Sequence, residues 1–150
     1  MARYLTVLAL LAVVVGAGAQ ETGVGVVNGA FEGDENNDGI ADGWEYSSGA
    51  LAEKLDVTLS VEQGREGGTC QKIACTRHED GHAMVCQIGT VGVEEGKWYR
   101  VTFWARGEEL DRASVALHDT DGWQQCGLWQ SFRTRDRWRK FSYRFVANHD

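Results

Sequence analysis

The sequence predicts an all-β fold, a β-sandwich of the jelly-roll, galactose-binding-like kind with two antiparallel sheets. Short runs of alternating apolar and polar residues are separated by clusters of Gly, Asp and Asn, at intervals typical of a sandwich. Glycine occurs 19 times and proline not at all, and helix signals are nearly absent. We find no internal repeat and no linker, so residues 20–150 read as one domain.

The individual strands follow from the period-two alternation. In the run 98–106 the odd positions form an aromatic and aliphatic face, while the even positions, including Trp104 and Arg106, form the other face. The segment 121–130, which contains Trp123 and Trp129, reads as a Gly-rich polar loop. The clearest predicted strands are 56–62, 69–77, 83–88, 98–106, 114–118 and 138–146.

An export signal precedes the domain. Arg3 is followed by the apolar run 5–15, and Ala17-Gly18-Ala19 forms a small-residue cleavage site before Gln20. The apolar run is too short to span a bilayer, so residues 1–19 are predicted to be a cleaved signal peptide and no membrane insertion is expected. The chain is therefore expected to be secreted or periplasmic.

The net charge of the chain excludes some classes of binding partner. The formal net charge is −7, and it becomes −8 without the signal, which contains only Arg3 among the charged residues. Such an acidic domain is a poor candidate for binding nucleic acid or an anionic membrane. Neutral or cationic partners fit better.

The four cysteines are candidates for disulfides, because exported proteins fold in oxidising compartments. Cys70 and Cys75 are about 16 Å apart if extended on one strand, which is too far for a bond between them. A hairpin centred on Asp80-Gly81 would place Cys75 opposite Cys86. We therefore predict Cys75–Cys86, with Cys70 and Cys126 as a second bridge or as two free thiols.

The segment D-E-N-N-D-G-I-A-D-G-W-E, residues 34–45, meets every fixed position of the D-x-[DN]-x-[DN]-G-x5-E calcium loop. A hard cation needs several oxygen ligands from one short loop, and Gly39 permits the turn that gathers them. The flanks do not look helical, so we predict a structural Ca²⁺ site and not a sensor. A polar surface loop is the alternative. The predicted ligands are Asp34, Asn36, Asp38, the carbonyl of Ile40, Asp42 and Glu45.

These pieces resemble the jelly-roll carbohydrate-binding modules of the cellulose- and xylan-binding type, the group of families four, nine, sixteen and twenty-two. The resemblance covers nearly all of the chain after the signal. The segments that carry it are V-N-G-A-F-E-G (27–33), D-G-W (42–44), G-G-T-C-Q-K-I (67–73), V-C-Q-I (85–88), G-K-W-Y-R-V-T-F-W-A-R-G (96–107) and R-W-R-K-F-S-Y-R-F (137–145).

The resemblance implies a β-sandwich that binds a glycan chain in a groove on its concave face and has no catalysis of its own. It also implies a structural calcium near the N-terminal strand, to which Glu32 contributes. This chain departs from the group in its cysteines and in stopping about where a last strand carrying aspartates should begin. The domain is therefore expected to be incomplete at its C-terminal end, or to be the first module of a longer protein.

Several side chains are candidates for sugar contact, because a sugar packs its C–H face on a flat aromatic ring and its hydroxyls on polar groups. Trp104 and Arg106 are outward neighbours on one strand, which His118 and Gln87 could join. Trp123 and Trp129 are the tryptophans least easily explained as core. Packing under a loop remains an alternative for Trp104, and so does an ion pair for Arg106. In the resembling modules the hairpin that carries His82 approaches the groove.

The sequence gives little support for a catalytic site. The adjacent glutamates 94–95 and 108–109 point to opposite faces of a strand or lie in turns, whereas a glycosidase needs carboxylates that face each other across a cleft. The sequence contains neither G-x-S-x-G nor H-E-x-x-H. We therefore expect a non-catalytic module that binds a polysaccharide, attached to further domains. The alternatives are a calcium-stapled adhesive sandwich with a protein partner and a small jelly-roll enzyme.

Overall fold

The structure is a computed structural model that describes residues 3–8 (as backbone), 25–49, 54–110 and 112–149. Within these residues the chain forms strands joined by loops and one 3₁₀ turn, η1 (Arg65–Gly67). The strands are β1 (Arg3–Leu8), β2 (Glu45–Ser48), β3 (Leu55–Gln63), β4 (Thr69–His78), β5 (Ala83–Cys86), β6 (Trp98–Glu108), β7 (Ala113–His118), β8 (Gln125–Phe132) and β9 (Arg139–Val146).

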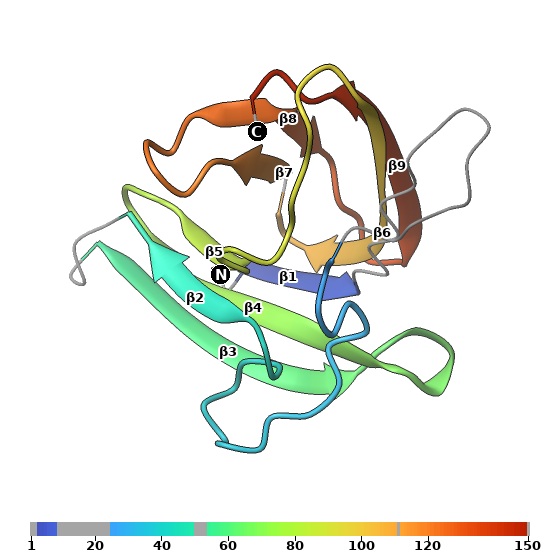
Figure 1. Ribbon diagram of the computed structural model, residues 1–150. Helices are drawn as coiled ribbons and strands as arrows, with labels where there is room; N and C mark the ends of the chain where they lie inside the picture. Colours follow the sequence, from blue (N-terminus) through green and yellow to red (C-terminus); the bar gives the residue numbers. More distant parts are fainter. Residues whose placement is uncertain (1–2, 9–24, 50–53, 111, 150) are drawn as a thin grey trace.

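The strands form one large sheet and two small ones, and every pair is antiparallel. The large sheet has the order β3-β4-β1-β6-β9, and the small sheets are β2-β5 and β7-β8. The large sheet curves from β3 up to β9, and the β7-β8 pair closes over it (Figure 1). The all-β sandwich that the sequence predicts is therefore confirmed.

The core lies between the large sheet and the β7-β8 pair. The odd positions of β6 are buried, as the alternation predicts, and Phe103 packs its ring edge-on against Phe132 of β8 with centroids 4.9 Å apart. Hydrophobic burial of this kind is the dominant favourable term in folding. The buried cluster consists of Phe31, Ala41, Tyr99, Val101, Phe103, Ala105, Leu128, Phe132, Phe145 and Ala147.

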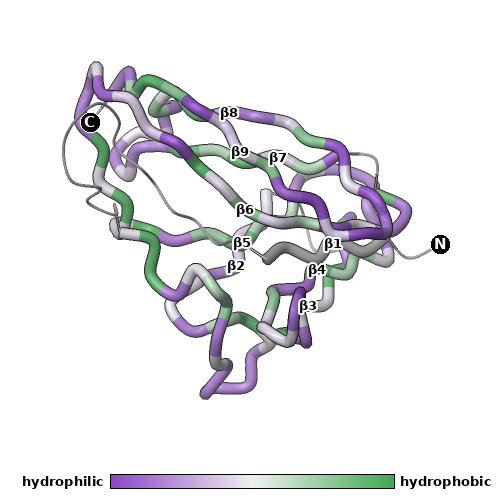
Figure 2. The backbone as a smooth tube through the Cα atoms, turned by 90° about the vertical axis from the view of Figure 1, so that its right-hand side faces the viewer, coloured by the Kyte–Doolittle hydropathy of each residue, from purple (hydrophilic) through white to green (hydrophobic). Residues whose placement is uncertain are grey.

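The Asp-rich loop projects away from this core at the lower end of the molecule in Figure 1, and Figure 2 colours that end as hydrophilic. Its base is held by Asn28, whose side-chain amide donates to the carbonyls of Glu32 (2.6 Å) and Asp42 (2.8 Å). The start and the end of the loop are thus tied to the same residue.

Each of the predicted strands exists, with its ends in place or shifted by one or two residues. The segment predicted as a polar loop is different, because Gln125–Phe132 forms β8 and only the residues before it form a turn. Leu128 and Phe132 are buried on its inner face, and β7 supplies its hydrogen-bonded partner. The glutamines and the glycine of this segment weaken its alternation of apolar and polar residues. It forms a strand nevertheless, because its inner face packs on the core.

The segment predicted to begin the signal peptide contains a strand. Backbone residues Arg3–Leu8 form β1, which lies between β4 and β6 in the large sheet. The predicted cleavage site before Gln20 lies outside the described residues.

The predicted disulfides are not formed, because no disulfide joins Cys70, Cys75, Cys86 or Cys126 in the structure. The hairpin register behind the Cys75–Cys86 prediction is wrong, because β4 and β5 do not pair with each other across Asp80-Gly81. Cys75 lies opposite Val57 of β3, and Cys86 lies opposite Glu45 of β2. Cys70 and Cys126 are both buried, and burial raises the pKa of each thiol.

Candidate functional site

Three aromatic side chains gather on the β7-β8 sheet. His118 meets Trp129 edge-on, with ring centroids 5.6 Å apart, and lies 6.3 Å from the ring of Trp123. Trp129 lies opposite Ala116 in the ladder, one diagonal step from His118, so both side chains lie on the outer face of the sheet. We call His118, Trp123 and Trp129 the Trp cluster.

The turn between β7 and β8 presents Trp123. Asp119 Oδ1 accepts a hydrogen bond from the amide of Gly122 at 2.6 Å, and the Asp119 amide donates to the Gln124 carbonyl at 2.9 Å. Trp123 has φ of 57°, a left-handed conformation that is uncommon for a bulky residue. Backbone strain of this kind persists only where the surroundings enforce it, and it concentrates at functional sites.

Asp119 is held in its ionised form. Its pKa is lowered, first by the hydrogen bond from the Gly122 amide and also by the Gln124 and Trp123 amides and the charge of His149. Its second oxygen, Oδ2, is buried and lies 3.1 Å from His149 Nε2, and no hydrogen-bond donor among the described residues is aligned with it. Sequence reasoning passed over Asp119, although Asp followed three positions later by Gly is a common pattern of β-turns.

The indoles of the Trp cluster face water. Trp123 is 59% exposed and Trp129 is 55% exposed, although large aromatic side chains normally bury their rings. Polar groups surround them on the same face. Gln125 is paired with His118 in the ladder, and the Ser114 and Ser131 hydroxyls are 3.1 Å apart. The arrangement offers apolar ring surfaces bordered by hydrogen-bonding groups.

Trp104 and Arg106 do not join the Trp cluster. Both lie on the outer face of the large sheet, because the even positions of β6 point away from the core. The guanidinium of Arg65 lies 3.8 Å from the ring centroid of Trp104, and that of Arg106 lies 5.3 Å from the ring of Trp138. Cation–π contacts therefore already engage both side chains within the protein.

Gln87 and His82 flank β5 in the β2-β5 sheet and do not join the Trp cluster either. Gln87 fastens two loops together, because its amide nitrogen donates to the carbonyls of Val27 (2.5 Å) and Gly43 (2.9 Å). Its oxygen accepts from the Val27 amide at 3.1 Å. The ring of His82 lies against Gly49, where an added Cβ would be 2.3 Å from Cε1.

The Asp-rich loop is closed by its own side chains. Asp34 accepts hydrogen bonds from the amides of Asp38 and Gly39, each at 3.0 Å, and Asp38 Oδ1 accepts from the Ile40 amide at 2.8 Å. Asn36 donates to Asp38 Oδ2 at 2.9 Å. Gly39 has φ of 83°, so it provides the turn that the motif requires.

The remaining predicted calcium ligands lie at the surface of the Asp-rich loop and at its two ends. Asp42 Oδ1 accepts from the Glu35 amide, Glu45 is exposed at the first residue of β2, and Glu32 is exposed beside Asn28. In the part of the chain that the structure describes, no three His, Cys, Asp or Glu side chains are grouped so that they could hold a metal ion. The carboxylates as arranged accept hydrogen bonds from backbone amides of the loop, and the calcium site stays a prediction.

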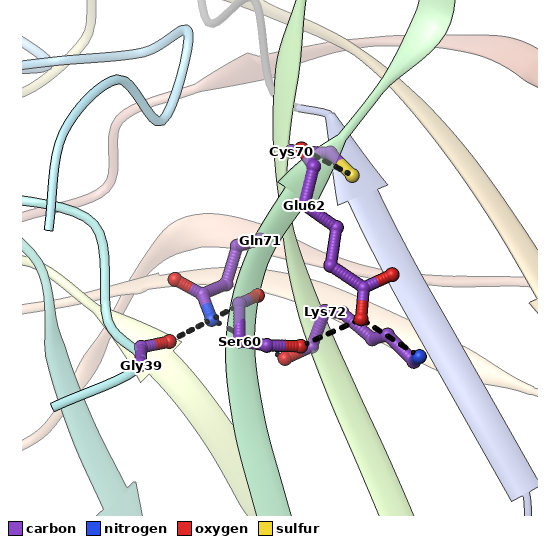
Figure 3. A network of polar contacts seen from close by, with 6 residues as sticks. All are labelled: Gly39, Ser60, Glu62, Cys70, Gln71 and Lys72. Atoms are coloured by element: carbon purple, nitrogen blue, oxygen red, sulfur yellow. Dashed lines mark hydrogen bonds and ion pairs between the residues drawn. The ribbon is translucent and has the colours of Figure 1, made fainter. Parts of the chain in front are cut away.

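Gln71 anchors the Asp-rich loop to the large sheet, and sequence reasoning missed it. Its side chain is completely buried. The amide nitrogen donates to the carbonyls of Gly39 (2.8 Å), Ser60 and Lys72 (both 3.2 Å), as Figure 3 shows in part. The same figure shows the neighbouring Lys72–Glu62 ion pair, at 2.9 Å.

Comparison with known protein families gives a match. A family model described as a carbohydrate binding domain matches residues 25–150, which is most of the chain. No curated protein matches the chain, and no solved structure does. Among the described residues, no helix is long and apolar enough to cross a membrane.

Proposed function

The chain belongs to this family of carbohydrate-binding domains, and we propose that it holds a polysaccharide chain against the Trp cluster on the outer face of the β7-β8 sheet. The exposed, neighbouring indoles of Trp123 and Trp129 carry the proposal. A sugar ring has an apolar C–H face that packs on an indole, and burying two indoles removes a large apolar area from water.

Polar side chains beside the indoles would orient the sugar. His118 and Gln125 form a cross-strand pair next to Trp129, and the Ser114 and Ser131 hydroxyls follow on the same face. Each can donate or accept a hydrogen bond to a sugar hydroxyl. Because the indoles sit on a paired strand and in a pinned turn, little conformational freedom would be lost on binding.

We propose further that the module is exported, has no catalysis of its own and serves an attached domain. By holding polysaccharide close, it would raise the effective concentration of substrate for that domain. Export is supported by the signal-like residues 1–19. The sequence spacing of the Asp-rich loop supports a structural calcium, which would require the Asp34 and Asp38 carboxylates to turn from backbone amides toward the ion.

Affinity electrophoresis tests the function. The protein would be run through gels that contain soluble β-glucan, xylan, mannan or galactan, and we expect retardation in at least one gel. Trp123→Ala and Trp129→Ala should remove the retardation. Trp98→Ala is the matched control, because Trp98 is equally exposed (59%) but lies outside the Trp cluster.

The result also separates the alternatives. Retardation that survives both Trp-cluster variants and disappears in Trp98→Ala would move the ligand site to the start of β6. A folded protein that no gel retards would favour the adhesive sandwich with a protein partner. Release of reducing sugar from the retained glycan would favour the small jelly-roll enzyme.

A further inference from the structure

The place of β1 in the large sheet is unusual, because β1 joins two halves of the sheet. Its backbone pairs with β4 from Arg3↔Cys75 to Val7↔Gln71, and with β6 from Tyr4↔Glu108 to Leu8↔Trp104. In the part of the chain that the structure describes, the β3-β4 pair and the β6-β9 pair are linked within the sheet only through β1. Figure 1 shows β1 in this central position.

This strand lies inside the segment that the sequence predicts to be removed on export. Cleavage after Ala19 would leave β4 and β6 with a row of backbone N–H and C=O groups facing the vacated place. An unpaired strand edge is a template for pairing with another extended chain. Two such edges that face each other offer hydrogen bonds to both sides of one inserted strand.

We propose that the interval between β4 and β6 is a strand-acceptor site, occupied by Arg3–Leu8 before processing and by an extended peptide afterwards. The peptide would run antiparallel to both neighbours, as β1 does. This proposal is separate from glycan binding and rests on the proposed removal of residues 1–19.

The core-facing positions of the site, 5 and 7, form its inner row, and they favour apolar residues in the bound peptide. Position 5 lies between Ile73 and Gly107, and position 7 lies between Gln71 and Ala105, and all four of these neighbours are buried. Along β6 the buried row changes from large to small, from Phe103 to Ala105 and Gly107, where β1 pairs. Buried neighbours without charge therefore favour apolar residues at positions 5 and 7.

Position 6, on the outer face of the sheet, forms the outer row of the site, and its neighbours disfavour a positively charged residue in the bound peptide. Position 6 lies opposite Lys72 on one side and Arg106 on the other, and Glu62 pairs with Lys72 at 2.9 Å, so two positive charges and one negative charge border this position. Like charges directly opposite one another destabilise a sheet, whereas opposite charges stabilise it. The matching partner is therefore an extended segment with apolar residues at positions 5 and 7 and a neutral or acidic residue at position 6.

A cut-and-exchange experiment tests the proposal. A protease site would be inserted between Ala19 and Gln20 of the full chain, and the folded protein would be cut and passed through a sizing column. The cut fragment is the first extended peptide available to the site, so we expect it to stay bound until another peptide displaces it. A fluorescent peptide of residues 1–9 should then exchange into the complex, with uptake followed by anisotropy.

Two competitor peptides with the same added charge give the matched control. Val7→Asp places a carboxylate in the apolar inner row and should compete at least about tenfold more weakly than the unmodified peptide. Thr6→Asp places it between Lys72 and Arg106 and should compete equally well or up to about threefold better. Equal competition by both variants would show binding without a register and would overturn the proposal.

The remaining outcomes are also decisive. A fragment that separates from a domain that keeps its melting temperature and takes up no peptide would overturn the proposal. Dimerisation of the cut domain that excess peptide cannot reverse would assign the place to a second copy instead. If the cut domain precipitates, the intact chain gives the answer. There, Val7→Asp should lower the melting temperature and Thr6→Asp should not, and equal effects would overturn the proposal.

Discussion

Gln71 Oε1 accepts a hydrogen bond from the amide of Ala41, 2.9 Å away, although the two residues are thirty positions apart in the chain. The Gln71 amide nitrogen donates at the same time to the Gly39 carbonyl at 2.8 Å. One buried side chain therefore satisfies backbone groups on both sides of Ile40, at the place where the Asp-rich loop returns to the sheet. A buried polar group is expensive unless it is hydrogen-bonded, and here the network is well satisfied.

Gln71→Leu should therefore destabilise the fold. The Ala41 amide would lose its partner in a buried place, and an unsatisfied buried group costs about 1–3 kcal/mol. We expect the free energy of unfolding, measured by urea denaturation, to fall by about 2–3 kcal/mol. Gln63→Leu is the control, because Gln63 is exposed on the neighbouring strand β3. Equal losses in both variants would mean that the Gln71 network contributes no more than an exposed glutamine does.

Replacing Asp119 should weaken glycan binding more than it lowers the stability of the fold. Asp119→Ala removes the acceptor of the Gly122 amide, so the turn that holds Trp123 at φ of 57° would relax. We expect retardation in the glycan gel to fall about tenfold, since a 1.4 kcal/mol loss of binding is tenfold in affinity. The melting temperature should change by only a few degrees, because the turn is at the surface.

Asp121→Ala is the matched control for that experiment. Asp121 lies in the same turn with the same charge, and its side chain is exposed. If both variants weaken retardation equally, the effect comes from the lost negative charge and not from the hydrogen bond to Gly122. A difference between the two variants would identify Asp119 as a residue that positions Trp123.

Glycan binding should also depend on pH through Asp119. The pKa of this carboxyl is lowered chiefly by the Gly122 amide, so its ionised form stabilises the turn. That contribution is fully present above the ordinary aspartate pKa of about 3.9, and it is lost as the pH falls through the lower pKa of the folded state. We expect the affinity for a neutral glycan, measured by titration calorimetry, to lose this contribution only once the pH falls below the ordinary aspartate range. Asp119→Asn cannot titrate, so its affinity should lack this part of the decline.

The strands could be predicted from the sequence where the alternation is long, but their partners could not. β6 alternates over its whole length because one face packs on β7 and β8. Asp80-Gly81 favours a β4-β5 hairpin locally, whereas β5 pairs with β2, which lies before β3 in the chain. Long-range pairing depends on which faces meet in the core, and local turn residues carry no information about that.

The candidate site could be predicted only in part, because some of its contacts come from segments that are distant in the sequence. The exposed positions of Trp123 and Trp129 follow from their polar, Gly-rich context, and His118 follows from its strand. The sheet face of Trp104 follows from its alternation, but its cover by Arg65 does not, because Arg65 comes from the η1 turn outside the strand. Likewise, a buried role for Gln71 has no local signal, since its partners lie in the Asp-rich loop and on β3.

Asp38 gives the sharpest test of the proposed calcium. Asp38 Oδ1 now accepts the Ile40 amide at 2.8 Å, and a bound ion would draw the same carboxylate to itself. We expect calcium to raise the melting temperature of the unmodified protein, because an ion that binds only the folded state stabilises it. In Asp38→Ala that rise should be lost. In chelator, the variant should lose only the exposed hydrogen bonds from the Ile40 amide and from Asn36, about 1 kcal/mol or less for each.

Glu35→Ala is the control that separates the loss of a calcium ligand from the loss of repulsion among the carboxylates of the Asp-rich loop. Glu35 lies in the same loop, is exposed and stands at a position of the motif that provides no ligand. Its removal lowers the repulsion among the loop carboxylates as much as Asp38→Ala does, so both variants should behave alike if charge alone matters. If calcium binds, Glu35→Ala keeps the calcium-dependent rise and Asp38→Ala does not. A melting temperature of the unmodified protein that is the same in calcium and in chelator would rule the structural calcium out, because the loop would then be closed by its own hydrogen bonds alone.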